Sequence, residues 1–303
     1  MFSQKLNMVI FLASIICVTS TLAQSDAQLN RIPYSSLVDH SDREYLLYLP
    51  KGYEDDPDKE WPVLFFLHGN GERGNGKSEL DFVMVHGPLY EAWIQKRDLP
   101  FIIIAPQLHM FGRDKHAKYI AERTLDQLPK RLENGVPERE AKWSSDEQME
   151  GSLSVDSYPF EALGPPMGWE QVEQDLLHML NYVTTNYQTD QSRIYLTGLS
   201  YGGFGTWYMG SKYPELFAAI SPVVGWGHQD LMPSLAENKI PIWCVAGGRD
   251  LAVELKYFYP GLNELERLGH QVRFTIEADM AHDTWKRVYA GEDLYNWFLA
   301  QHK

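Results

Sequence analysis

The chain has 303 residues, of which 44% are hydrophobic and 22% are charged, so it can bury a sizeable core in one large domain or two small ones. Its formal net charge is −14 at pH 7. This acidic balance argues against nucleic-acid binding, which requires basic patches that contact phosphates.

Residues 1–23 have the pattern of a secretory signal peptide. Lys5 supplies a positive start, residues 9–18 form a short apolar core, and Ala23 is a small residue before the expected cleavage site. The apolar run is too short to span a bilayer. We therefore expect a mature chain of residues 24–303 that is secreted or periplasmic and has no membrane anchor.

The two cysteines support this expectation. Cys17 would be removed with the signal peptide, and Ile16 stands where a lipoprotein signal has a small residue. Cys244 then remains alone, so the mature chain can form no internal disulfide. Because Cys244 lies in an apolar run, we expect it to be a buried packing residue.

From residue 44 onward, short apolar runs alternate with helix-like stretches, which is typical of a parallel sheet covered by helices on both faces. Several runs are apolar without alternation, as in strands buried on both faces. The predicted strands are 44–49, 62–67, 101–105, 193–197, 219–224, 242–246 and 272–276. Apolar residues at helical spacing predict helices over 169–186, 255–268 and 294–301. The predicted fold class is therefore α/β, with a mostly parallel sheet.

Residues 108–168 interrupt this alternation. The stretch is rich in charge and proline and contains no convincing strand, although 118–132 could form a helix and 150–168 has the composition of a loop. An insertion of this length inside a compact domain is usually a functional lid or a mobile segment. The sequence leaves both interpretations open.

The strongest motif is Gly-Leu-Ser-Tyr-Gly at residues 198–202, with Ser200 at its centre. It directly follows a predicted strand and precedes a predicted helix that runs to Tyr213. A sharp strand-to-helix turn presents its central serine hydroxyl at the carboxyl edge of the sheet, and the helix directs its positive end toward a developing oxyanion. This context favours a nucleophilic serine over an incidental serine in a glycine-rich turn.

A serine hydroxyl needs a base, and the base needs an orienting acid. Asp250 directly follows the predicted strand 242–246, and His282 comes a few residues after the predicted strand 272–276. Both therefore lie on loops at the carboxyl edge, where open α/β sheets bind ligands. Asp279 and Asp283 are rival acids, but they share a loop with His282 and cannot easily reach its far nitrogen. We prefer Asp250.

Two backbone amides are candidates for an oxyanion hole. One is the N–H of Tyr201, which follows the serine. The loop 68–74 follows the predicted strand 62–67, and it is expected to supply the second donor through the N–H of Asn70. Its neighbours Glu72 and Arg73 are expected to brace the loop by pairing.

No metal or cofactor site is predicted. His109 and His116 are seven residues apart, with Asp114 between them, and this spacing does not match a paired zinc-ligand motif. No phosphate-binding glycine motif occurs either.

Three segments together resemble bacterial exported esterases of the α/β-hydrolase superfamily, in the branch of polyhydroxybutyrate-depolymerase-like and feruloyl or acetylxylan esterase-like enzymes and related predicted peptidases. The segments are LHGNGERG at 67–74, RIYLTGLSYGG at 193–203 and HDTW at 282–285. The resemblance covers about residues 45–107 and 169–301. It implies the α/β-hydrolase fold, a triad of Ser200, Asp250 and His282, and no cofactor. Residues 108–168, which follow the fold's fourth strand, are longer than the connection in this family.

These residues support three functions. The first is a carboxylic-ester hydrolase that acts through an acyl-enzyme on a small-molecule or polysaccharide-linked ester, such as plant cell-wall or polyester-type esters. The second is a serine peptidase, because the motif around Ser200 also suits prolyl-oligopeptidase-like catalytic domains, although the 303 residues contain no large amino-terminal propeller. The third is a non-catalytic binding protein on a hydrolase scaffold. The acyl group, the alcohol and the oligomeric state are not predicted.

Overall fold

The computed structural model describes residues 24–133, 145, 147, 149–152 and 154–303. The predicted signal peptide, residues 1–23, lies outside the described residues. Within the described part, no helix is both long enough and apolar enough to cross a membrane.

The described residues form one eight-stranded sheet with the order β1-β2-β4-β3-β5-β6-β7-β8. Strands β3 to β8 are parallel, whereas β2 pairs antiparallel with both β1 and β4. The strands are β1 (Gln28–Ser35), β2 (Asp42–Leu49), β3 (Trp61–Leu67), β4 (Ile102–Ala105), β5 (Thr189–Leu199), β6 (Ala219–Val223), β7 (Trp243–Gly247) and β8 (Arg273–Glu277). The mostly parallel sheet predicted from the sequence is confirmed.

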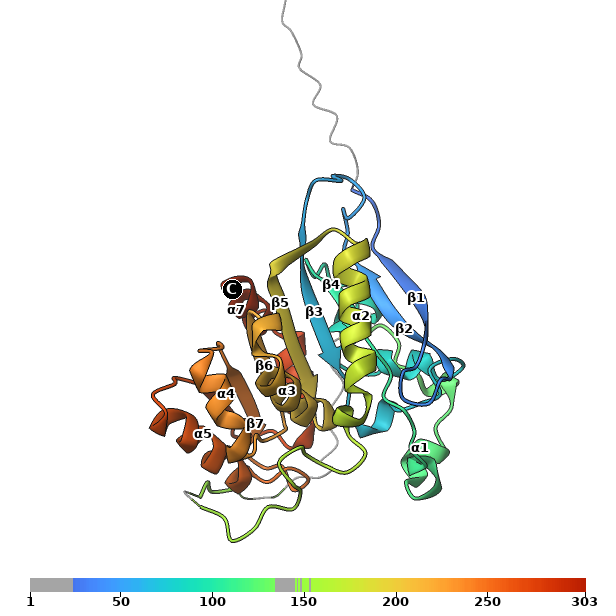
Figure 1. Ribbon diagram of the computed structural model, residues 1–303. Coiled ribbons are helices and arrows are strands. Elements are labelled where there is room, and N and C mark those ends of the chain that lie inside the picture. Colours follow the sequence, from blue (N-terminus) through green and yellow to red (C-terminus); the bar gives the residue numbers. More distant parts are fainter. Residues whose placement is uncertain (1–23, 134–144, 146, 148, 153) are drawn as a thin grey trace, which may run out of the picture.

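Helices cover both faces of the sheet, and Figure 1 shows α2 and α3 on one face and α7 on the other. The helices are α1 (Lys118–Ala121), α2 (Glu173–Asn186), α3 (Tyr201–Lys212), α4 (Met232–Glu237), α5 (Phe258–Arg267), α6 (Trp285–Ala290) and α7 (Asp293–Leu299). All seven side chains of β3 are buried. Val63, Phe65 and Leu67 pack in a core with α2 to α5, whereas Leu64 and Phe66 pack with α6, α7 and the short turns η2 (Leu80–Met84) and η3 (Tyr90–Ile94). The uniformly apolar strand therefore separates two cores.

The sequence missed β1 and misjudged one helix. Strand β1 contains Asn30, Arg31 and Pro33 and pairs only with β2, and an edge strand of this kind tolerates polar residues and proline. The stretch 118–132, which could have formed one helix, does not: α1 ends at Ala121, and a separate short turn, η5 (Leu125–Gln127), ends before Leu128. Leu128 is extended, with ψ of 138°, because the following proline disfavours a helical conformation there.

The described residues of the insertion 108–168 lie against the carboxyl edge of the sheet, which is the lower edge in Figure 1. Its described residues contain short helical turns and no strand of the sheet. The backbone N–H groups of Ser145 and Met149 donate to the carbonyls of Arg249 and Gly248, which follow β7. The insertion thus contacts the loops that carry the candidate site.

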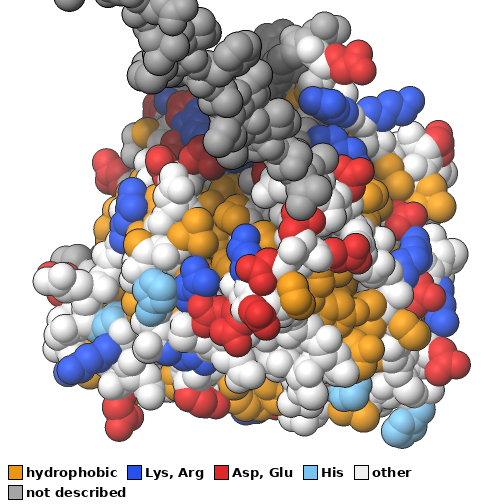
Figure 2. Space-filling view, turned by 90° about the horizontal axis from the view of Figure 1, so that it is seen from above, with side chains coloured by type: hydrophobic (Ala, Val, Ile, Leu, Met, Phe, Trp, Pro, Cys, Tyr) orange, Lys and Arg blue, Asp and Glu red, His pale blue; other side chains and the backbone are white. Residues whose placement is uncertain are grey.

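The surface seen in Figure 2 carries acidic and basic side chains side by side, with hydrophobic side chains between them. No continuous basic patch is visible on this face, in keeping with the net charge of −14. In the interior, Cys244 is buried on β7, as its apolar surroundings predicted, and its thiol is free. Burial raises the pKa of this thiol well above its usual range.

Glu173, the first residue of α2, joins this helix to the end of α3. Its carboxylate accepts hydrogen bonds from Tyr208 and Lys212, and from the Tyr213 hydroxyl at 2.6 Å. Burial alone would raise the pKa of Glu173, but these three hydrogen bonds outweigh it and lower the pKa to about 2. The ionised carboxylate therefore stabilises the folded state above the ordinary pKa of 4.5, and this contribution is lost as the pH falls toward 2.

We expect Glu173→Gln to lower the free energy of unfolding at pH 7 by roughly 2 kcal/mol, because the neutral amide cannot accept a charge-assisted bond from Lys212. The difference from the unmodified protein should shrink between pH 4.5 and pH 2, as measured by urea unfolding at several pH values. Glu254→Gln is the control, because the ion pair of Glu254 with Lys256 is exposed to solvent. A difference that is independent of pH would contradict the assignment.

Candidate active site

Ser200 forms the turn between β5 and α3. Its backbone has a φ of 52° and a ψ of −116°, a conformation that residues with a side chain rarely adopt. The turn is held from both sides, because the N–H of Ser200 donates to the Val223 carbonyl at 3.0 Å and the Phe204 N–H donates to the Ser200 carbonyl at 3.1 Å. The side chain is therefore held at the carboxyl edge of the sheet.

The glycines on each side of Ser200 provide the space that this turn needs. A Cβ atom on Gly202 would lie 1.8 Å from the Leu67 carbonyl oxygen, and one on Gly198 would lie 2.3 Å from the Gly202 carbonyl oxygen. Both distances are far below van der Waals contact, so the motif brings the end of β3 directly against the serine turn.

Asp250 and His282 meet Ser200 in space although they are distant in sequence. The His282 Nε2 atom lies 3.0 Å from the Ser200 Oγ atom, and its Nδ1 atom lies 2.7 Å from the Asp250 Oδ2 atom. The other oxygen of Asp250 accepts from the backbone N–H groups of Ala252 at 2.8 Å and Val253 at 3.0 Å. With the carboxylate fixed in this way, Nδ1–H donates to Asp250 and Nε2 is free to accept the serine proton.

The rival acids contact other side chains. Asp279 forms an ion pair with Arg287 at 2.7 Å, and the Asp283 carboxylate lies 3.5 Å from the Lys286 ammonium. Asp250 is fully buried, whereas the His282 side chain is 16% exposed. The imidazole can therefore reach both the buried acid and a substrate.

The two candidate oxyanion donors lie at helix starts. Tyr201 is the first residue of α3, and Asn70 is the first residue of the short turn η1 (Asn70–Glu72), so neither backbone N–H has an acceptor within its own helix. Gly69, the neighbour of Asn70, packs on the serine turn, and a Cβ atom built on it would lie 3.6 Å from the Ser200 Cβ. Both amides thus belong to segments that flank the Ser200 side chain.

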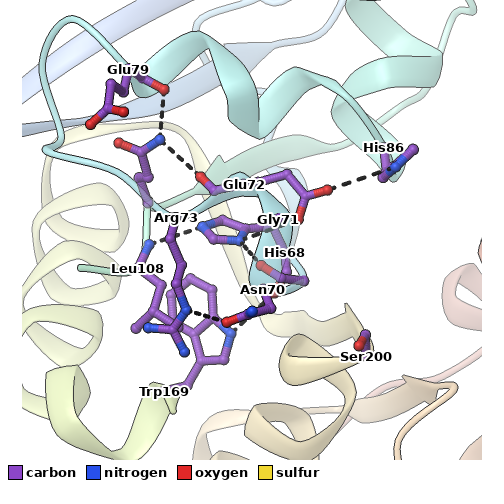
Figure 3. Close-up of polar contacts among 12 residues, drawn as sticks. His68, Asn70, Gly71, Glu72, Arg73, Glu79, His86, Leu108, Trp169 and Ser200 are labelled. Atoms are coloured by element: carbon purple, nitrogen blue, oxygen red, sulfur yellow. Dashed lines mark hydrogen bonds and ion pairs between the residues drawn. The ribbon is translucent and has the colours of Figure 1, made fainter. Parts of the chain in front are cut away.

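Glu72 and Arg73 do not pair with each other, contrary to expectation. Arg73 donates to the Asn70 side chain, whereas the Glu72 carboxylate lies 3.7 Å from ring nitrogens of both His68 and His86 (Figure 3). Burial raises the pKa of Glu72 to about 7. The same cause lowers the pKa of His68 to about 3 and that of His86 to about 4, so these imidazoles are neutral at pH 7. The loop is braced by separate contacts on its two sides.

Sequence reasoning missed the aromatic neighbours of His282. The Trp285 ring stands edge-to-face on His282, with centroids 5.1 Å apart, and also contacts His86 at 5.2 Å. Trp285 lay within the recognised segment 282–285, so its position could have been inferred. His86 lies among short turns that no hydrophobic periodicity marks.

The insertion adds aromatic side chains beside the serine helix. Phe160 packs edge-to-face on Phe204 of α3 and parallel to Trp226, with centroid distances of 5.7 and 6.1 Å. Tyr158 also packs on Trp226, at 5.1 Å. This aromatic wall combines residues from α3, the loop after β6 and the insertion. Among the described residues, no group of three or more histidine, cysteine, aspartate or glutamate side chains could hold a metal ion.

Comparisons with known proteins agree with this architecture. The model of the prolyl oligopeptidase family matches residues 168–235, which include the serine turn. A ferulic acid esterase from Anaeromyces mucronatus, solved in complex with ferulic acid, superposes with a TM-score of 0.52, covering 93% of this chain and 92% of that one at 17% identity. The chain has the α/β-hydrolase fold.

The chain has two distant curated relatives. It is 43% identical over 47 residues to poly(3-hydroxyalkanoate) depolymerase C of Paucimonas lemoignei, a match that covers 16% of this chain and 11% of the relative. It is 40% identical over 53 residues to feruloyl esterase B of Neurospora crassa, covering 18% of each chain. The matched segments thus span less than a fifth of each relative.

Proposed function

We propose that this protein is a serine-dependent carboxylic-ester hydrolase. The observation that carries the proposal is the continuous hydrogen-bonded chain from Asp250 through His282 to Ser200, with distances of 2.7 and 3.0 Å. Such a chain makes an otherwise inert hydroxyl reactive toward an acyl carbon.

In the proposed reaction, Ser200 Oγ attacks the ester carbonyl while His282 Nε2 takes its proton. Asp250 stabilises the imidazolium that forms. The backbone N–H groups of Asn70 and Tyr201 donate to the oxyanion, at the positive end of α3. His282 then protonates the departing alcohol, which leaves an acyl-enzyme. Water, activated by the same imidazole, attacks the acyl carbon and releases the acid.

We infer that the substrates are esters of the plant cell-wall or polyester type. The two curated relatives support this inference, because their names describe a feruloyl esterase and a polyhydroxyalkanoate depolymerase. Such extracellular substrates agree with export directed by residues 1–23, and we propose a secreted or periplasmic location.

The proposal can be tested by labelling the purified protein with a fluorophosphonate probe and mapping the modified peptide. We expect stoichiometric labelling of Ser200, together with turnover of p-nitrophenyl acetate and methyl ferulate. An unlabelled, inactive protein would instead support a non-catalytic binding role.

A serine peptidase is the second candidate, because the prolyl oligopeptidase family model covers the serine turn. Matched p-nitrophenyl ester and p-nitroanilide substrates with the same acyl group separate the two activities. We expect the ester to be hydrolysed and the anilide to be resistant, whereas efficient anilide cleavage would favour the peptidase.

A further inference from the structure

Arg73 is a fully buried arginine beside the candidate oxyanion hole. Its guanidinium donates from three nitrogen atoms: Nε to Asn70 Oδ1 at 2.6 Å, Nη1 to the His109 carbonyl at 2.9 Å and Nη2 to the Met167 carbonyl at 2.6 Å. Figure 3 shows the side chain extending past the loop toward Asn70. One planar group therefore connects the oxyanion loop with the two ends of the insertion.

The same guanidinium also lies over the second proposed oxyanion donor. The Arg73 Cζ atom is 4.8 Å from the centre of the Tyr201 ring, within cation–π range. Arg73 thus contacts both residues whose backbone amides face the reacting carbonyl in the proposed reaction.

The oxygens that bind the Arg73 guanidinium are neutral, although Glu170 acts on its charge from a greater distance. Among the described residues, no carboxylate lies within 4.0 Å of its guanidinium, and the acceptors that it uses are neutral oxygens. Burial lowers the pKa of Arg73 to about 10, so the group remains charged at neutral pH. A buried cation without a carboxylate partner is costly for stability, but it favours negative charge that develops nearby.

A second arginine holds the outer side of the same loop. Arg123, which follows α1, donates to the carbonyls of Gly71 and Arg73 and pairs with Glu79 at 3.0 Å. Its side chain is only 8% exposed. Tyr119 of α1 also contacts the Asn70 side-chain amide. The described segment 109–123 is therefore bonded to the loop that carries Asn70.

We propose that Arg73 and Arg123 are positioning residues that hold the Asn70 amide in the geometry of the oxyanion hole. Together with the segment 109–123 they form a brace, by which we mean a set of contacts that keeps the oxyanion loop in place when the transition state forms. This inference rests on the proposed function. A brace of this kind acts on the transition state more than on the bound substrate, and its loss lowers kcat more than it raises KM.

The test uses Arg73→Lys, which keeps the charge but cannot form three bonds in one plane, and Arg123→Met. We expect kcat for p-nitrophenyl acetate to fall by about 10²-fold in Arg73→Lys and by about 10-fold in Arg123→Met, with KM changed by less than about threefold. Inhibition by a phenylboronic acid, which forms a tetrahedral adduct on serine, should weaken in proportion to kcat/KM. Fluorophosphonate titration gives the folded, reactive fraction in each sample.

Arg97→Met is the matched control. Arg97 also donates to backbone carbonyls, those of Tyr289 and Gly291, and pairs with Glu91 and Glu292 as Arg123 pairs with Glu79, but it lies outside the oxyanion loop. This variant should lower Tm while kcat per reactive site stays unchanged. Unchanged kcat per reactive site in both Arg73→Lys and Arg123→Met, or an increase in KM alone, would contradict the positioning role proposed for these two arginines. If the unmodified protein neither hydrolyses esters nor reacts with the probe, the proposed function fails and the brace fails with it.

Discussion

Replacing Ser200 with alanine is expected to lower kcat for p-nitrophenyl acetate by about 10⁵- to 10⁶-fold, the range known for loss of the nucleophile in a serine hydrolase. The reason is chemical, because alanine offers no oxygen to attack the carbonyl and His282 has no proton to accept. The remaining rate would come from the oxyanion donors and substrate binding. Steady-state hydrolysis and fluorophosphonate labelling measure the effect.

The fold should survive this substitution. Alanine retains the Cβ atom in the same strained turn, and the backbone bonds of Ser200 to Val223 and Phe204 do not involve the side chain. We expect Tm to change by only a few degrees. Ser211→Ala is the matched control on α3, because its hydroxyl donates only to the Tyr208 carbonyl. Undiminished turnover in Ser200→Ala, with normal turnover in the control, would refute the assignment of the nucleophile.

Replacing Asp250 with asparagine is expected to lower kcat by about 10⁴-fold with little change in the fold. The backbone N–H groups of Ala252 and Val253 select an oxygen at the Oδ1 position, so the new amide NH₂ must point at His282. Two donors then face each other unless the imidazole changes its tautomer. In the changed tautomer, Nε2 carries a proton and cannot accept one from Ser200.

The matched control is Asp279→Asn, which alters a rival acid near His282 in sequence. Asp279 is bonded to Arg287, so its loss should reduce stability slightly and leave kcat unchanged. The pH dependence of kcat/KM should be measured for both variants. A large loss of activity in Asp279→Asn, with normal activity in Asp250→Asn, would exchange the roles of the two acids.

The sheet could be predicted because each buried parallel strand appears in the sequence as a short run of apolar residues. Strand β3 is apolar at every position, and the turn around Ser200 requires the glycines that the sequence supplies. Strand β1 was not predictable from local pattern, because it lies at the edge and its polar residues carry no such signal. A helix over 118–132, which the sequence allowed, does not form: α1 ends at Ala121, and Pro129 keeps Leu128 extended after the next short turn.

The candidate triad was named from the motif around Ser200 and from chain order, because each member lies a few residues after a predicted strand and the ends of parallel strands meet at one edge. The choice between Asp250 and its rivals, by contrast, depends on which carboxylate reaches Nδ1 of His282, and distances across the chain decide that. The hydrogen-bond partners of Arg73 could not be predicted from the sequence either, because His109 and Met167 lie 36 and 94 residues further along the chain.

The sequence by itself determined the mostly parallel α/β architecture and the candidate site residues that follow the buried strands, because apolar strand composition, the steric needs of the serine turn and chain order can be read along the chain. Only the tertiary structure decided which contacts surround these residues. It placed the Asp250 carboxylate on the His282 imidazole, the Arg73 guanidinium against the oxyanion loop, and the insertion in contact with that loop. These contacts form between segments that are distant in sequence, and their geometry depends on packing of the whole domain, which no local pattern encodes.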